Sequence, residues 1–167
     1  MSSKVTSVTA KTLATLFVAI LAISAMFNLR VGFGAQNIDC IDSFMHIVHY
    51  KAPGTIESGE YVVFVGPEKM KEPFAGHLII KKVAAVAGDT VKVKDGILFI
   101  NGEKAGELDV ADKAAKRLGV SEDSFNMEQV IPEGLIFVRG TKPRSFDSRY
   151  WGLLPIQNVV GSAYPVI

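Results

Sequence analysis

From residue 31 onward, short apolar runs alternate with turn residues, a pattern that is typical of a mainly β domain. The segments TVKV (90–93) and ILFI (97–100) flank the turn KDG and predict a β-hairpin, which the Asn-Gly pair at 101–102 closes. The other segments that we expect to be strands are 60–65, 77–86, 134–140 and 159–167.

One helix is expected within this domain, over residues 109–118. Asp109 is of the residue type that caps a helix, and Gly119 is of the type that ends one. The apolar stripe of this helix consists of Val110, Ala114 and Leu118. The polar segments 66–76 and 120–132 are expected to form loops, so the domain is β-rich with a small helical insertion.

The N-terminal region has a different pattern, with no charged residue over 12–29. A helix of this length would span roughly 27 Å, close to the ~30 Å hydrocarbon core of a bilayer. We therefore expect a cytoplasmic tail (1–11), a transmembrane signal-anchor (12–29) and an exported domain (30–167). Two lysines precede the apolar stretch and one arginine follows it, which favours an N-terminus inside. A cleaved signal peptide and a buried core helix remain alternatives.

The composition excludes some classes of function. With 18 basic and 17 acidic residues, the chain has no charge excess, and its basic residues form no stripe of the kind that binds nucleic acid. Cys40 is the only cysteine, so no intrachain disulfide can form and the core must hold the fold together.

The candidate chemistry begins with Lys81 and Lys82, which interrupt an apolar strand in HLIIKKVAAVAGDT (77–90). Successive side chains of a strand point to opposite faces, so one of the two lysines must face the core. A buried lysine whose pKa falls from ~10.4 toward neutrality can act as a general base for a serine hydroxyl. The alternative is that both lysines only protect a strand edge from aggregation.

Three other sites are weaker candidates. His46 and His49 have a spacing that would suit metal ligands on a helix, but this region is predicted to be extended. Ser43 with His46 or His49 could form part of a triad, yet no glycine-flanked nucleophile turn accompanies it. Cys40 has no basic residue placed to activate it, and a small buried side chain is the simpler interpretation.

The segment GTKPRSFDSRYWGLLP (140–155) resembles the late motif of the type I signal peptidase family, G-D-N-R-x-N-S-x-D-S-R-Y-W-G. The residues that match are Gly140, Ser145, Asp147, Ser148, Arg149, Tyr150, Trp151 and Gly152. Thr141, Lys142 and Pro143 depart from it. GEYVVF (59–64) and KKVAAVAGDTVKV (81–93) resemble two earlier boxes of the family, in the same order.

The resemblance implies a catalytic pair. The family's catalytic lysine corresponds to Lys81, and the serine placed as the nucleophile is Ser43, in CIDSFMHIV. This nucleophile box is divergent, because Phe44 stands where the family has methionine. Ile41 occupies the position of a hydroxyl residue that can help to bind the oxyanion, so backbone N–H groups would have to supply the oxyanion hole.

The resemblance also implies supporting roles. Ser145 corresponds to the serine that orients the lysine. Asp147 and Arg149 are expected to form a structural salt bridge, and Lys82 is expected to point outward. No cofactor and no metal are implied.

The divergent nucleophile box, the short chain and the single apolar segment are most like the TraF/TrhF conjugative-transfer peptidases of the family. We therefore expect a serine endopeptidase of the bacterial inner membrane, with a periplasmic domain that cleaves signal peptides or pro-peptides. Pilin subunits would be the substrates and conjugative type IV secretion components the partners, and cyclisation of the product is as compatible with the sequence as hydrolysis. The alternative is a non-catalytic, membrane-tethered assembly factor of a secretion or pilus machine. A self-cleaving cytoplasmic repressor is disfavoured by the N-terminal apolar segment.

Overall fold

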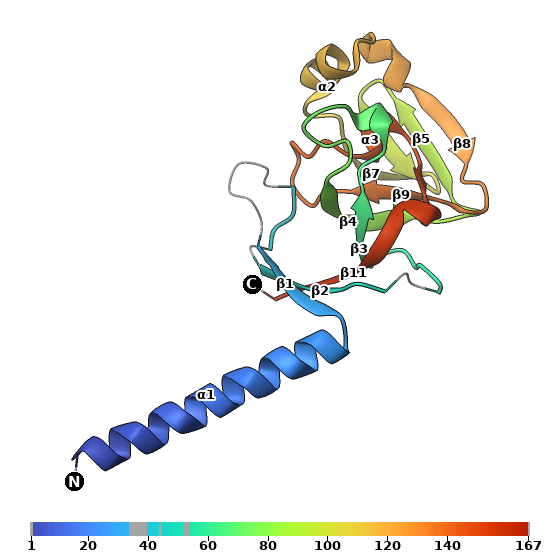
Figure 1. Ribbon diagram of the computed structural model, residues 1–167. Helices are drawn as coiled ribbons and strands as arrows, with labels where there is room; N and C mark the ends of the chain where they lie inside the picture. The colour runs from blue at the N-terminus through green and yellow to red at the C-terminus, as the bar shows by residue number, and fades with distance from the viewer. Residues whose placement is uncertain (1, 34–39, 44, 52–53, 167) are drawn as a thin grey trace.

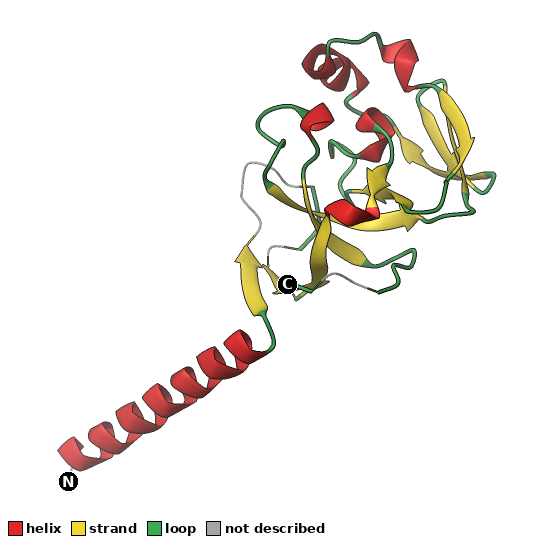
Figure 2. Ribbon diagram, turned by 45° about the vertical axis from the view of Figure 1, so that its right-hand side comes forward, coloured by secondary structure: helices red, strands yellow, loops and turns green. Residues whose placement is uncertain are grey.

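The computed structural model describes residues 2–33, 40–43, 45–51 and 54–166. Helix α1 (Ser2–Met26) extends away from a domain built mainly of strands, and both termini lie on the same side of that domain (Figure 1). In the second view, α1 again extends away from the domain, and the strands lie beyond its C-terminal end (Figure 2). The mainly β class predicted from the sequence is confirmed.

The described residues form two antiparallel sheets. The larger sheet has the order β1-β2-β11-β3-β4-β9-β10, and the smaller has the order β7-β6-β5-β8. The strands of the larger sheet are β1 (Leu29–Phe33), β2 (Met45–His49), β3 (Tyr61–Val65), β4 (Leu78–Ala85), β9 (Leu135–Arg139), β10 (Leu154–Pro155) and β11 (Val159–Pro165). Those of the smaller sheet are β5 (Thr90–Lys94), β6 (Ile97–Ile100), β7 (Glu103–Glu107) and β8 (Met127–Val130).

Short helices cover the junctions between strands. They are α2 (Ala111–Leu118), α3 (Ser148–Trp151) and the 3₁₀ turns η1 (Glu68–Met70), η2 (Glu122–Phe125) and η3 (Ile156–Asn158). Helix α2 lies at the end of the domain farthest from α1 (Figure 1).

The predicted hairpin is confirmed: β5 pairs with β6 from Val91↔Ile100 to Lys94↔Ile97. The hairpin turn has its two central residues, Asp95 and Gly96, at positive φ, and so does the next turn, at Asn101 and Gly102. Asp-Gly and Asn-Gly pairs tolerate this conformation well. The four other predicted strands are present as β3, β4, β9 and β11.

The predicted helix is present but begins later than expected. It starts at Ala111 with Val110 as its N-cap, so Asp109 does not cap it. The carboxylate of Asp109 instead lies 3.7 Å from the Arg149 guanidinium. Gly119 ends the helix in the left-handed conformation, as predicted.

The prediction of an entirely loop-like segment over 120–132 was wrong. It contains η2 and strand β8, which pairs with β5 from Thr90↔Val130 to Val93↔Met127. Strand β7, EKAGE, likewise pairs with β6. Neither short segment has strong β-propensity, so ladder hydrogen bonds to a well-formed neighbour determine their structure.

The N-terminal boundaries also differ from the prediction. Helix α1 runs from Ser2 without a break near residue 11, because that stretch contains no glycine or proline. It ends at Met26, and β1 begins at Leu29, so the predicted segment 12–29 is not one helix. Within the described part of the chain, no helix combines the length and the apolarity needed to cross a membrane. The predicted transmembrane helix is therefore not supported.

The main core lies between one face of the larger sheet and helices α2 and α3. It contains Val62, Phe64, Val83, Val138, Ala114, Tyr150 and Trp151, among others. A second cluster, with Val91, Leu98 and Phe137, joins the two sheets. The third cluster lies on the other face of the larger sheet and contains Val48, Val63 and Ala163. Both faces of strands β3 and β4 are therefore covered at their centres.

Candidate active site

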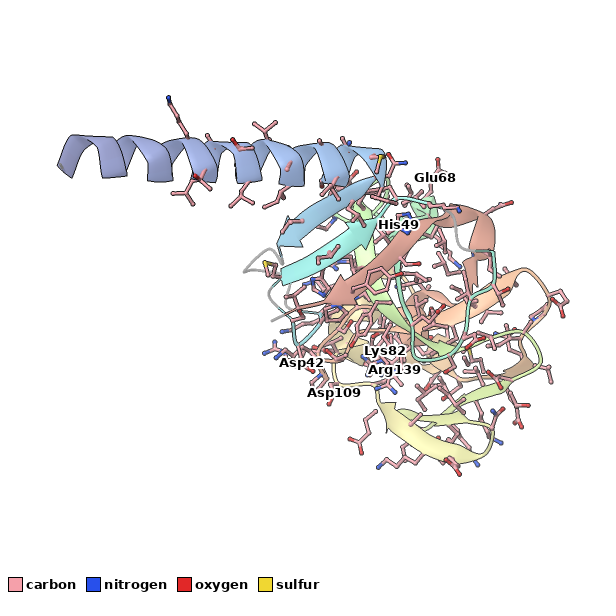
Figure 3. All side chains as sticks on the ribbon, turned by 90° about the horizontal axis from the view of Figure 1, so that it is seen from below. Asp42, His49, Glu68, Lys82, Asp109 and Arg139 are labelled. Atoms are coloured by element: carbon pink, nitrogen blue, oxygen red, sulfur yellow. The ribbon has the colours of Figure 1, made fainter. Side chains whose placement is uncertain are left out.

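Lys81 and Lys82 point to opposite faces of the larger sheet. Lys81 pairs with Val62 of β3, and Lys82 pairs with Tyr61. Directly paired residues share a face, and Val62 belongs to the main core, so Lys81 points inward and is only 1% exposed. Lys82 is exposed, with Nζ 5.9 Å from the centre of the Tyr61 ring. Figure 3 shows it beside Arg139, its cross-strand partner in β9.

The buried Lys81 has a close polar partner in Ser145. Nζ donates a hydrogen bond of 2.7 Å to Ser145 Oγ, and Ser145 is fully buried. Among the described residues, no carboxylate forms an ion pair with Lys81. Burying an ammonium group without a counter-charge is energetically costly, which makes this position unusual for a lysine with only a structural role.

A buried ion pair fixes the loop that carries Ser145. Arg149 Nε donates to Asp147 Oδ1 at 2.8 Å, and Nη2 donates to Oδ2 at 2.9 Å. The second carboxylate oxygen also accepts the Gly140 N–H at 2.9 Å, and Nη2 donates to the Ser145 carbonyl at 3.1 Å. Burial acts to lower the pKa of Arg149, but the hydrogen bonds and charge of Asp147 outweigh it and raise the pKa above its ordinary value.

The segment leading to Ser43 runs along the start of the same loop. The Asp42 N–H donates to Thr141 Oγ1 at 2.7 Å, and the Lys142 N–H donates to the Cys40 carbonyl at 3.3 Å. The side chains of Lys142 and Asp42 form an ion pair of 2.7 Å. Residues 99 positions apart in the chain are thereby held together immediately before Ser43.

Gly140 brings this segment close to the buried lysine. A Cβ atom on Gly140 would lie 2.3 Å from the Cys40 carbonyl oxygen and 2.1 Å from Ser145 Oγ. Both oxygens therefore approach the same point beside the glycine. Because Ser145 contacts Lys81, the Cys40 carbonyl, three residues before Ser43, lies near the Lys81–Ser145 pair.

Ser43 itself is half-buried and lies just before strand β2. Its hydroxyl donates to the Met45 carbonyl at 2.8 Å. Ile41, two residues earlier, is buried and offers no hydroxyl group. Phe44, on which part of the sequence comparison depended, lies outside the described residues.

The histidines do not form a joint site. His46 and His49 are three residues apart in strand β2 and so point to opposite faces of the sheet. Within the described ranges, no group of three or more histidine, cysteine, aspartate or glutamate side chains could hold a metal. His46 is buried, burial lowers the pKa of its imidazole, and its Nε2 has no hydrogen-bond partner among the described residues.

The contacts of Asp42 with Thr141 and Lys142 were not predicted from the sequence. Thr141 and Lys142 are two of the residues at which the late motif departs, so a comparison of motifs gives them no role. The opposite charges of Asp42 and Lys142 were the available signal, but nothing local in the sequence places them side by side.

Comparisons with known proteins agree with the motifs. The family model described as "Signal peptidase, peptidase S26" matches residues 5–167. The chain is 37% identical over 112 residues to thylakoidal processing peptidase 1 of Arabidopsis thaliana, covering 63% of this chain and 30% of that protein. It is 32% identical over 119 residues to probable signal peptidase I-1 of Synechocystis sp., covering 69% and 55%.

A solved structure is also similar. The crystal structure of a signal peptidase I from Enterococcus faecalis is 27% identical, covers 65% of this chain and 96% of that one, and superposes with a TM-score of 0.40. The chain thus spans only 30% and 55% of the length of the two curated relatives above. Since the family model matches nearly the whole sequence, the chain belongs to the signal peptidase family, peptidase S26.

Proposed function

We propose that this protein is a serine endopeptidase that uses Ser43 as nucleophile and Lys81 as general base. The observation that carries the proposal is the buried Lys81, hydrogen-bonded to Ser145 at 2.7 Å beside the segment that leads to Ser43. A neutral lysine amine can take the proton of a serine hydroxyl, which is otherwise a weak nucleophile. Family membership supports the proposal, because signal peptidase I homologues are serine endopeptidases.

The reaction would proceed in two steps. Ser43 Oγ attacks the scissile carbonyl carbon and passes its proton to Lys81, which then protonates the leaving amine. Water, activated by the same amine, releases the acyl group from Ser43. The Ser43 hydroxyl must turn away from the Met45 carbonyl before the first step, since it donates there in the structure. With Ile41 in place of a hydroxyl residue, backbone N–H groups, including that of Ser43, would stabilise the oxyanion.

The supporting residues would act on the lysine. Ser145 holds the Lys81 amine in one orientation by accepting its hydrogen bond. Asp147 and Arg149 hold the Ser145 loop, and they do not touch the reacting atoms in this scheme.

The substrates we propose are exported pre-proteins, which would lie against the sheet as an additional strand. Pilin subunits of conjugative transfer, with type IV secretion components as partners, are a narrower hypothesis that depends on the divergent nucleophile box. Release of the acyl group to a peptide amine would cyclise the product, whereas release to water would give two linear fragments.

The test is to incubate the full-length purified protein with precursor proteins, pre-pilins included, and to analyse the products by mass spectrometry. Ser43→Ala and Lys81→Ala should each abolish cleavage, and the matched control Lys82→Ala should retain most of it. Equal loss from both lysine variants, or cleavage that persists without Ser43, contradicts the assignment. The product mass also distinguishes linear fragments from a cyclic one.

A non-catalytic assembly factor is the second candidate. The observation in its favour is that the Ser43 hydroxyl already donates to the Met45 carbonyl. Normal pilus assembly in cells that carry Ser43→Ala, with precursors left intact by the wild-type protein, would favour this role.

Attachment to the bacterial inner membrane, with the domain in the periplasm, is proposed from the charge asymmetry around 12–29 and from family membership. Fusion of a periplasm-active reporter enzyme to the C-terminus tests the orientation, and alkaline extraction of membranes tests the attachment. An inactive reporter or a protein released by alkali contradicts it.

A further inference from the structure

The residues where the late motif departs from the family pattern make a specific set of contacts. Thr141 Oγ1 accepts the N–H of Asp42, and the Lys142 ammonium pairs with the Asp42 carboxylate, both at 2.7 Å. The Lys142 N–H adds a bond to the Cys40 carbonyl at 3.3 Å. These contacts, which we call the 42/142 clamp, join two segments that are distant in the sequence.

The clamp ends at the residue before Ser43. On its other side, Gly140 and the loop beyond it lead to Ser145, which holds Lys81 at 2.7 Å. The clamp therefore connects the segment that leads to Ser43 with the loop that carries Ser145. Lys142 and Asp42 are both partly exposed, so their charges remain accessible to salt.

We propose that Asp42, Thr141 and Lys142 are positioning residues that set the placement of Ser43 relative to Lys81. This inference rests on the proposed peptidase function. The clamp contacts do not involve the lysine itself, so loosening the clamp would change the approach of the Ser43 hydroxyl to the Lys81 amine and to the substrate carbonyl. The effect is expected in kcat and not in KM, since positioning errors at reacting atoms reduce the rate of the chemical step.

The clamp contributes little to fold stability. An exposed ion pair typically contributes only a small fraction of the stability of a domain. Lys92 and Glu128 of the smaller sheet provide a matched control pair, because they also lie 2.7 Å apart and have side-chain exposures of 38% and 62%, against 39% and 64% for Lys142 and Asp42. Loss of activity without loss of thermal stability thus separates positioning from a merely structural role.

The test measures kcat, KM, the melting temperature and amide hydrogen exchange in full-length Asp42→Asn, Lys142→Met and Thr141→Val, with Lys92→Met and Glu128→Gln as controls. We expect about three- to ten-fold lower kcat in the clamp variants, KM within two-fold, unchanged melting temperature and faster exchange of the residue-42 amide. The charge-swapped double variant Asp42→Lys/Lys142→Asp should recover kcat to within about two-fold of wild type.

The outcomes separate the two proposals. Faster amide exchange with unchanged kcat overturns the positioning role while leaving the peptidase assignment intact. Equal losses of kcat in the Lys92 and Glu128 controls also overturn it, because the effect is then not specific to the clamp. A wild-type protein that cleaves no precursor, although its residue-42 amide is protected, overturns the peptidase function and this inference with it.

Discussion

Gly140 lies so close to Ser145 that a Cβ atom added to the glycine would fall 2.1 Å from the serine Oγ. The same atom would meet the backbone carbonyl of Cys40 at 2.3 Å. Position 140 therefore requires glycine, because a larger residue would not fit between the Cys40 carbonyl and Ser145. The missing side chain lets the segment that leads to Ser43 pack against the loop that carries Ser145.

Gly140→Ala should abolish the proposed peptidase activity. The methyl group must displace both Ser145 and the Cys40 carbonyl, and a displacement of about 1 Å at reacting groups can cost on the order of 100-fold in rate. The measurement is kcat/KM on a cleavable precursor. Gly54→Ala is the matched control, because a Cβ at Gly54 meets nothing within 4 Å. Full activity of Gly140→Ala would show that cleavage does not depend on the close packing of the segment that leads to Ser43 against the loop that carries Ser145.

Lys81→Met should abolish cleavage while leaving the free energy of unfolding unchanged or higher. Methionine has a similar length and removes a buried cationic group that has no acidic partner among the described residues. Urea unfolding and the cleavage assay together check this expectation. A large drop in the free energy of unfolding would indicate that the amine holds the fold together through Ser145.

Arg149→Met should destabilise the protein strongly. It leaves the buried Asp147 carboxylate without its cation, and breaking a buried pair from one side costs about 3–5 kcal/mol. Lys92→Met, which breaks an exposed pair, should cost at most about 1 kcal/mol. Urea unfolding compares the two, and equal losses would contradict the special role of the buried pair.

The stability should fall in mildly acidic solution because of His46. Burial lowers the pKa of this imidazole below 6.5, so the folded state binds its proton less readily than the unfolded chain does. The contribution is therefore fully present above pH 6.5 and is lost as the pH falls below it. His46→Phe should flatten the dependence of the melting temperature on pH between 7 and 5, whereas the exposed-histidine control His77→Gln should keep the wild-type profile. An identical profile in His46→Phe would refute this account.

Local patterns were sufficient for much of the fold. Alternating apolar residues and Asp-Gly or Asn-Gly turns identified the β5–β6 hairpin, since both signals act between neighbouring residues. Strands β7 and β8 were not predicted, because EKAGE and MEQV have little strand propensity and become strands through pairing with β6 and β5. The start of α2 was misplaced: Val110 is its N-cap, and Asp109 lies beside Arg149, a contact with another segment that the local sequence does not reveal.

The sequence by itself determined that one lysine of the pair at 81 and 82 must face the core, since side chains alternate along a strand. Its late motif, together with the match of the family model, determined the family. The resemblance implied that Lys81 is the inward lysine and that Ser145 contacts it, and the tertiary structure shows this arrangement between residues 64 positions apart in the chain. Only the tertiary structure decided that Asp42 meets Thr141 and Lys142. The physical reason is that such contacts depend on strand order and register, which arise from the packing of the whole chain and leave no periodic signal in any one segment.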